Sequence, residues 1–121
     1  MWGKMTPAQM FEHCQQLDLW VQRGGSEKQT LIGRLVGWYV LRSIMKPGAP
    51  LPKNVPTLPT LVAKGGEGFE VVRQAWLDSL EGYADFSAPS LMHDFFGRMS
   101  RDKAGEFVWK HADHHLTQFG V

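Results

Sequence analysis

The sequence predicts a single all-α domain, a helical bundle with one long crossover loop. Apolar residues recur at the spacing of amphipathic helices in several segments of the chain, and no strand-like alternation stands out. Five of the seven prolines fall between residues 47 and 59, where they interrupt the helical pattern. The 121 residues correspond to one domain, because domains mostly contain about 100–200 residues.

The composition is that of a globular protein with enough apolar surface for one core, since 43% of the residues are hydrophobic and 21% are charged. Thirteen basic and twelve acidic residues give a net charge of +1 without a basic run, which argues against nucleic-acid binding. The single cysteine excludes an internal disulfide. The apolar stretch 31–45 contains two arginines and is too short to span a bilayer, and no signal peptide is recognised. We therefore expect a cytoplasmic protein that binds neither nucleic acid nor membranes.

The first helix is predicted from Pro7 to about Arg23. Thr6 supplies a hydroxyl that can accept a hydrogen bond from the first turn, and proline suits the first helical position. The Gly24–Gly25 pair predicts a left-handed helix end, because glycine adopts positive φ angles without steric cost.

A second helix is predicted over residues 26–45, and Lys46–Pro47 ends it. Gly33 and Gly37, four residues apart, would let another helix approach closely. The stripe along this helix contains Leu31, Leu35, Trp38 and Arg42, with Ile32, Val36 and Tyr39 beside it.

The proline-rich connection that follows is about twenty residues long, and such loops are usually functional or cover something. A third helix is predicted over residues 67–83, an irregular stretch over 84–99, and a last helix from Ser100 to about Gly120. Asp102 in the first turn of the last helix complements the positive end of the helix dipole. The predicted core positions of the third helix are Val71, Val72, Ala75, Trp76, Ser79 and Leu80.

Three of the five histidines lie in the last helix. At about 100° per residue, His115 lies about 40° from His111 around the helix axis, and His114 about 60° to the other side. An i, i+4 pair can offer two nitrogens to one metal ion. The spacing alone is equally typical of histidines that place positive charge near a helix C-terminus. His111 and His115 lie near the centre of the apolar face, which contains Ala104, Phe107, Val108 and Phe119.

The first helix carries His13 at the centre of an otherwise apolar stripe. A lone histidine in such a place is usually a hydrogen-bonded core residue, because a buried imidazole needs a partner. Two helices that both direct histidine inward form a stronger pattern, and His13, His111 and His115 together predict a three-histidine metal site. Three protein ligands leave room for water or substrate, as at a catalytic metal. The stripe around His13 contains Met10, Leu17, Trp20 and Val21.

Three blocks of sequence carry a family resemblance. Trp2-Gly3-Lys4-Met5-Thr6 leads into Gln9-Met10 and His13-Cys14, and the chain closes with Phe95-Phe96-Gly97 and His111-x-x-His114-His115-x-x-Gln118-Phe119-Gly120. These blocks resemble the DinB-like superfamily, and most closely a bacterial branch of it that is labelled a domain of unknown function. The resemblance covers nearly the whole chain.

The resemblance implies an all-α DinB-like bundle of the up-down-down-up four-helix type, reduced here to three long helices plus loops, over a single domain of residues 1–121. It also implies a divalent metal, zinc or nickel, with His13, His111 and His115 as its ligands. Relatives are regarded as metal-dependent hydrolases or use a low-molecular-weight thiol in transfer reactions. An enzyme that activates water or a thiol on an unknown substrate is therefore implied, since a metal-bound thiol loses its proton.

The chain differs from the family at its N-terminal segment, and this difference affects the oligomeric state that we expect. In the family an earlier helix precedes the Trp-Gly-Lys-Met segment, which begins here at Trp2. Either the chain is a shortened form or a partner subunit supplies the missing packing surface. Because the remaining helices would leave apolar area uncovered, we expect a homo-oligomer, namely a dimer.

Further residues are assigned supporting roles. Gln118 lies on the face of the His pair and is expected to hydrogen-bond a ligand or an imidazole. His114 is expected on the flank of that face, and His93 is expected to cap a turn or to line the mouth of a pocket. Cys14 is expected to be a small buried hydrophobic residue. The competing hypothesis is a non-catalytic helical protein that dimerises and whose histidines are structural or vestigial.

Overall fold

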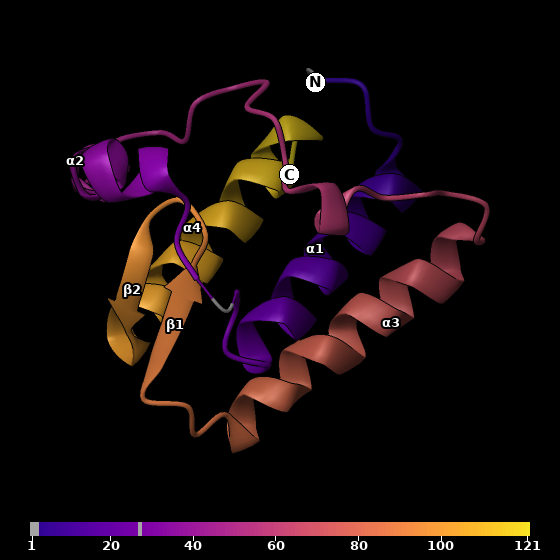
Figure 1. Ribbon diagram of the computed structural model, residues 1–121. Coiled ribbons are helices and arrows are strands. Elements are labelled where there is room, and N and C mark those ends of the chain that lie inside the picture. Colours follow the sequence, from indigo (N-terminus) through magenta and orange to yellow (C-terminus); the bar gives the residue numbers. More distant parts are fainter. Residues whose placement is uncertain (1–2, 27) are drawn as a thin grey trace.

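The computed structural model describes residues 3–26 and 28–121, which contain four α-helices and one two-stranded antiparallel sheet. Three helices form the body of the molecule: α1 (Pro7–Gln22), α3 (Phe69–Glu81) and α4 (Arg101–Gln118). Helix α1 packs along α3 and also contacts α4, so it is the central element (Figure 1). The long connection between α2 and α3 crosses over one end of this body.

The expectation of an all-α bundle is wrong, because residues 90–100 form a β-hairpin. Strand β1 (Ser90–His93) pairs antiparallel with β2 (Gly97–Ser100), and Leu91 lies opposite Met99. Both of these side chains point into the core, where they are 0% and 2% exposed. Strands of four residues are too short for their alternation to stand out in the sequence, and this region was therefore expected to be irregular.

Both predicted ends of the first helix are confirmed. The Thr6 hydroxyl accepts a hydrogen bond from the Gln9 backbone, and the Gln9 side chain accepts one from the Thr6 N–H, which completes a capping box. Gly25 has a φ of 81°, and its N–H donates to the Trp20 carbonyl at the helix end. Trp2, the first residue of the N-terminal motif, lies outside the described residues.

The second helical segment is shorter and less regular than predicted. It begins at Leu31, passes through a π-helical segment at Gly33–Gly37 and continues as α2 (Trp38–Ile44). Its two glycines do not receive another helix. They lie against the backbone carbonyl of Phe95 in the hairpin turn, where a Cβ atom on either glycine would overlap the Phe95 oxygen.

This packing turns the glycine side of the segment inward and its large apolar side chains outward. Leu31, Leu35 and Trp38 are 79%, 75% and 60% exposed. Helical periodicity identified the apolar stripe, but the close approach to Phe95 decides that the opposite side is buried.

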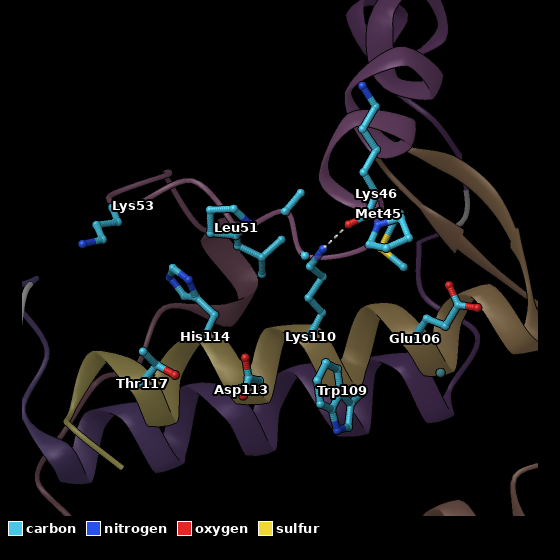
Figure 2. A pocket seen from close by; sticks show the side chains of 15 residues that line it. Met45, Lys46, Leu51, Lys53, Glu106, Trp109, Lys110, Asp113, His114 and Thr117 are labelled. Carbon is cyan, nitrogen blue, oxygen red and sulfur yellow. Dashed lines mark hydrogen bonds between the residues drawn. The ribbon is translucent and has the colours of Figure 1, made fainter.

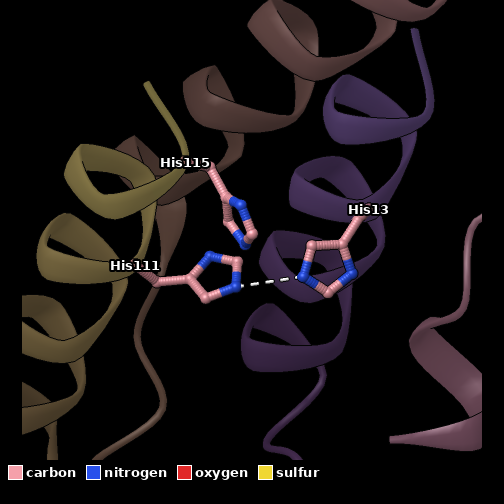
Figure 3. A group of neighbouring side chains, drawn as sticks. All are labelled: His13, His111 and His115. Atoms are coloured by element: carbon pink, nitrogen blue, oxygen red, sulfur yellow. Dashed lines mark hydrogen bonds between the residues drawn. The ribbon is translucent and has the colours of Figure 1, made fainter. Parts of the chain in front are cut away.

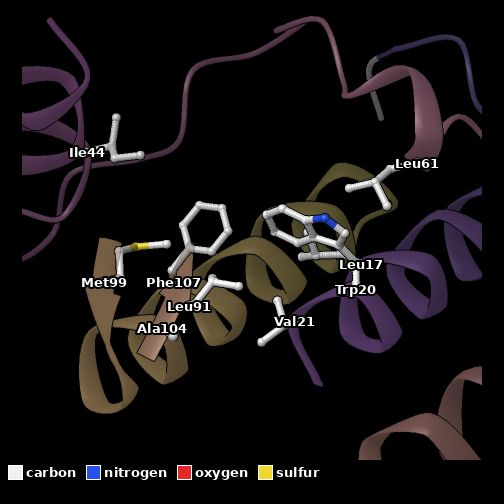
Figure 4. Close-up of a cluster of buried hydrophobic side chains, with 9 residues drawn as sticks. All are labelled: Leu17, Trp20, Val21, Ile44, Leu61, Leu91, Met99, Ala104 and Phe107. Carbon is white, nitrogen blue, oxygen red and sulfur yellow. The ribbon is translucent and has the colours of Figure 1, made fainter. Parts of the chain in front are cut away.

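The main hydrophobic core lies between α1, the hairpin and α4 (Figure 4). In the third helix Val72, Trp76 and Ser79 are buried as predicted, whereas Val71 is 60% exposed. Among the described residues no helix is long and apolar enough to cross a membrane. The residues of the main core are Leu17, Trp20, Val21, Ile44, Leu61, Leu91, Met99, Ala104 and Phe107.

A buried carboxylate joins α1 to α3. Asp18 is 3% exposed and accepts hydrogen bonds from the Trp76 indole N–H and the Tyr83 hydroxyl, each at 2.8 Å. Burial raises the pKa of Asp18, and the two hydrogen bonds oppose that rise. These two hydrogen bonds help to fix the rotation of α1 about its axis. Because His13 lies on the same helix, five residues before Asp18, they also help to fix the direction in which His13 points.

We expect Gly37→Ala to lower the free energy of unfolding by about 1–3 kcal/mol, because its new methyl group overlaps the Phe95 carbonyl. Gly105→Ala is the matched control. Gly105 also lies within a helix but has no atom within 4 Å of an added Cβ, and alanine there is expected to raise stability by up to about 1 kcal/mol. Urea denaturation measures both, and equal changes in the two variants would contradict the packing described.

Candidate metal centre

Three histidine side chains from two helices meet in the interior of the molecule. His13 comes from α1, and His111 and His115 come from successive turns of α4 (Figure 3). One nitrogen of each ring lies within 4.8 Å of the others, and the ring centroids are 4.5–5.0 Å apart. His13 and His115 are 5% and 8% exposed, whereas His111 is half-buried. The structure thus brings together the three residues that the sequence singled out.

The two ring nitrogens of His13 have different partners. Nδ1 lies 2.8 Å from the backbone carbonyl of Leu61, which can only accept, so Nδ1 carries the proton. Leu61 belongs to a 3₁₀ turn, η2 (Pro59–Leu61), in the proline-rich connection. The Nε2 lone pair of His13 then faces Nε2 of His111 at 3.1 Å. In the metal-free protein the Nε2–H of His111 therefore donates to this lone pair, and a cation bound there would take the place of that proton.

The tautomer of His115 is held in the same way. Its Nδ1 donates to the side-chain oxygen of Gln118, one turn later on α4, at 2.8 Å. Gln118 is 4% exposed, so this hydrogen bond is shielded from water. The proton therefore stays on Nδ1 and leaves the Nε2 lone pair free. Such a hydrogen bond to the far nitrogen is common in metal-bound histidines.

Burial keeps the three imidazoles neutral at pH 7. It lowers the pKa of His13, and the hydrogen bond to Leu61 opposes the shift. Burial, reinforced by the neighbouring His115 and His13, holds the pKa of His111 well below 6.5. Burial likewise lowers the pKa of His115 to about 4, against the opposing effect of Gln118. Neutral imidazole is the form that binds metal ions.

The connection that carries Leu61 is tied to α1 at a second point. The Glu12 carboxylate, next to His13 in the chain, accepts hydrogen bonds from the Lys64 and Gly65 backbone N–H groups at 2.9 and 2.8 Å. Neither Leu61 nor Glu12 is predicted from the sequence to have a role. A backbone carbonyl acts through its position and not its side chain, so its only signal was the unusual length of the connection.

His114 and Cys14 stay outside the cluster, as expected. His114 is half-buried on the flank of α4 and lines an open cavity of about 850 Å³ between α4 and residues 45–53 (Figure 2). The three clustered histidines do not line this cavity. Cys14 is 2% exposed and its thiol contacts the Met10 sulfur, and burial raises the pKa of the thiol far above its usual range.

His93 caps the hairpin turn. Its Nδ1 accepts hydrogen bonds from the Phe95 and Phe96 N–H groups at 3.0 and 3.2 Å. Its ring is buried among the side chains of Trp20, Phe96 and Phe107. Burial lowers the pKa of His93 to about 4, although the Asp94 carboxylate, 3.1 Å from Nδ1, favours the protonated form. The expectation of a turn cap is confirmed.

Comparison with known families gives one result. Residues 2–120 match the family described as "Protein of unknown function (DUF1569)". The chain belongs to the DUF1569 family. The sequence-based expectation of a domain of unknown function is thereby confirmed. No curated protein and no solved structure matches this DUF1569 chain.

The geometry of this DUF1569 site is compatible with metal binding. Nitrogens that bind one zinc ion lie about 2.0–2.1 Å from it, and two of them are therefore roughly 3 Å apart. The Nε2 atoms of His13 and His111, 3.1 Å apart, already have this separation. Three neutral imidazoles suit several divalent transition-metal ions, because imidazole nitrogen is a preferred ligand of zinc, copper, iron and nickel.

We expect the stability of the metal-free protein to fall as the pH is lowered from 7.5 to 4.5, in part because of His93. The pKa of His93 is about 4 in the folded protein and about 6.5 in the unfolded chain, so the unfolded chain binds the proton more readily between these values. His93→Asn keeps an acceptor for the turn but does not titrate. The free energy of unfolding of this variant should therefore fall by about 2 kcal/mol less than that of the unsubstituted protein over this pH interval. Denaturation with chelator at both pH values measures the difference, and equal losses would contradict a buried neutral His93.

Proposed function

We propose that this DUF1569 protein is a DinB-like metal-binding protein of the cytoplasm, in which His13, His111 and His115 hold one divalent ion, zinc or nickel. The observation that supports the proposal is the meeting of three neutral imidazoles from two helices, although His13 and His111 are 98 residues apart in the chain. Chance burial of histidines does not require one nitrogen of each of three rings to lie within 4.8 Å of the others. The carbonyl of Leu61 and the amide of Gln118 keep the protons on the opposite sides of two of the rings.

The ligand count favours a reactive site over a purely structural one. Three protein ligands leave at least one coordination position for a small molecule, whereas structural zinc sites are usually closed by four. A divalent ion held there would lower the pKa of a bound water or thiol. We therefore propose a metal-dependent hydrolase or a transferase that uses a low-molecular-weight thiol.

The chain's own residues would prepare this chemistry before any substrate binds. The low pKa values of the three histidines keep them unprotonated, so an ion displaces few protons when it binds. Cys14 does not compete as a nucleophile, because its thiol is buried and stays protonated. The nucleophile would have to come from a small molecule, which agrees with water or a thiol as the activated group.

The second candidate is a non-catalytic interaction protein with structural histidines. The specific observation in its favour is the exposed apolar side of residues 31–39. Metal binding separates the two candidates, because structural histidines would need no ion.

We expect untagged protein, stripped with chelator, to bind about one equivalent of zinc or nickel in calorimetric titration. His111→Ala should abolish the binding, because it removes one of the three ligands of the cluster. His114→Ala is the matched control: it changes a neighbouring histidine of the same helix that lies outside the cluster, and it should bind as the unsubstituted protein does. The melting temperature should rise on metal addition for the unsubstituted protein and not for His111→Ala. Only trace binding by the unsubstituted protein, or full binding by His111→Ala, would refute the proposal.

Gln118→Met should lower the metal affinity by about 10–100-fold, because Nδ1 of His115 loses the acceptor that fixes its tautomer. Thr117→Val, an exposed neighbour on the same helix, serves as the control and should leave the affinity unchanged. Competition with a chromophoric chelator measures both affinities. Unaltered binding by a folded Gln118→Met variant would show that this hydrogen bond does not orient a ligand.

A further inference from the structure

A continuous apolar surface lies on the outer side of residues 31–39. We call this surface the outer apolar face, and its six side chains are between 43% and 79% exposed. It is unusual because monomeric proteins rarely expose a contiguous apolar patch of more than a few hundred Å². In Figure 1 this segment projects at the edge of the molecule, beyond the hairpin. The residues of the outer apolar face are Leu31, Ile32, Leu35, Val36, Trp38 and Tyr39.

The segment that carries the outer apolar face is firmly packed against the rest of the molecule. The inward side is held tightly: Gly33 and Gly37 lie against the Phe95 carbonyl, and the Gln29 amide donates to the same oxygen at 2.9 Å. Ile44 at the end of α2 belongs to the main core. The helix therefore presents its outer side in a fixed position, so little additional conformational entropy would be lost when a partner binds.

The size of the outer apolar face matches one half of a protein interface. Six large apolar residues at these exposures leave roughly 800 Å² accessible, which is about the area that each partner contributes to a standard interface. Tryptophan, tyrosine and arginine are enriched in such interfaces, whereas lysine is depleted. The segment 31–44 contains one tryptophan, one tyrosine and two arginines, and no lysine.

The face is also complementary to itself. Leu31 and Tyr39 each lie four residues from Leu35, and Ile32 and Trp38 each lie three residues from it. A twofold axis beside Leu35 therefore sets aliphatic side chains of one copy opposite the aromatic rings of the other, in an antiparallel pair of helices. Symmetric dimers join identical patches in this way.

The two copies of Arg42 lie too far apart in that pairing to repel each other strongly. Arg42 lies seven residues from Leu35, about 10 Å along a helix, so its two copies in an antiparallel pair would be about 20 Å apart. Separated charges of this kind are largely screened at physiological ionic strength.

We propose that the outer apolar face is a homodimer interface, in which residues 31–39 of two copies pack antiparallel across a twofold axis at Leu35. The proposal is independent of the metal centre, because none of the three clustered histidines belongs to this segment.

The first test is sedimentation of the metal-free chain and its variants over a range of concentrations. We expect the unsubstituted protein to be a dimer at micromolar concentration. Leu35→Glu should raise the dissociation constant by roughly 30-fold or more, because it places two carboxylates in the centre of an apolar contact. Val71→Glu is the matched control, since Val71 is also an exposed aliphatic residue, on α3 (60% exposed, against 75% for Leu35), and this variant should remain dimeric.

The second test determines whether the two copies of residue 35 lie beside the twofold axis. Cys14 is the only cysteine and is 2% exposed, so it does not cross-link. Under mild oxidation Leu35→Cys should form a disulfide-linked dimer, because the two positions lie next to the axis, whereas Val71→Cys should not.

Three results would overturn the proposal. The first is a monomeric protein at high micromolar concentration. The second is a dimer that persists unchanged in Leu35→Glu. The third is a monomer that floats with phosphatidylglycerol vesicles and not with neutral ones, which would assign the face to an anionic lipid surface. Circular dichroism of Leu35→Glu checks that the fold is retained, as expected for a residue that is 75% exposed.

Discussion

The hydrogen-bonded side chain of His13 is the constraint on which the arrangement of this protein depends. One imidazole connects three parts of the chain: helix α1 that carries it, the proline-rich connection through the Leu61 carbonyl, and α4 through His111. Both ring nitrogens are buried and polar, so neither can be left without a partner at low cost. The hydrogen bond to Leu61 therefore fixes where the connection crosses α1. The contact with His111 requires that the histidine side of α4 faces α1.

Other polar side chains of α1 support this arrangement by tying the helix to further segments of the chain. Asp18 ties α1 to Trp76 of α3 and to Tyr83, and Glu12 ties it to the backbone after Leu61. Each of these contacts joins residues more than 45 positions apart. The site thus lies on rigid helices and not on loops, which is the condition for holding ligand atoms in a constant geometry.

Much of the fold was readable from local signals. The ends of α1 follow from Thr6, Pro7 and the glycine pair, because capping and left-handed termination depend on neighbouring residues only. The hairpin was missed, since its four-residue strands are stabilised by pairing with each other and by the burial of Leu91 and Met99 against helices distant in sequence. The π-helical segment was missed for a similar reason. It packs on a carbonyl of the hairpin, which no periodicity can reveal.

The sequence by itself determined which side chains could form the site: histidines at i and i+4 on one helix and a third at the centre of the apolar stripe of another. This was possible because the positions of residues around a helix follow from their spacing. Only the tertiary structure decided that the two helices face each other, that Leu61 and Gln118 hold the protons of two rings, and that the apolar side of residues 31–39 points outward. These features depend on contacts between distant segments, whose relative placement is set by the packing of the whole core and not by local spacing.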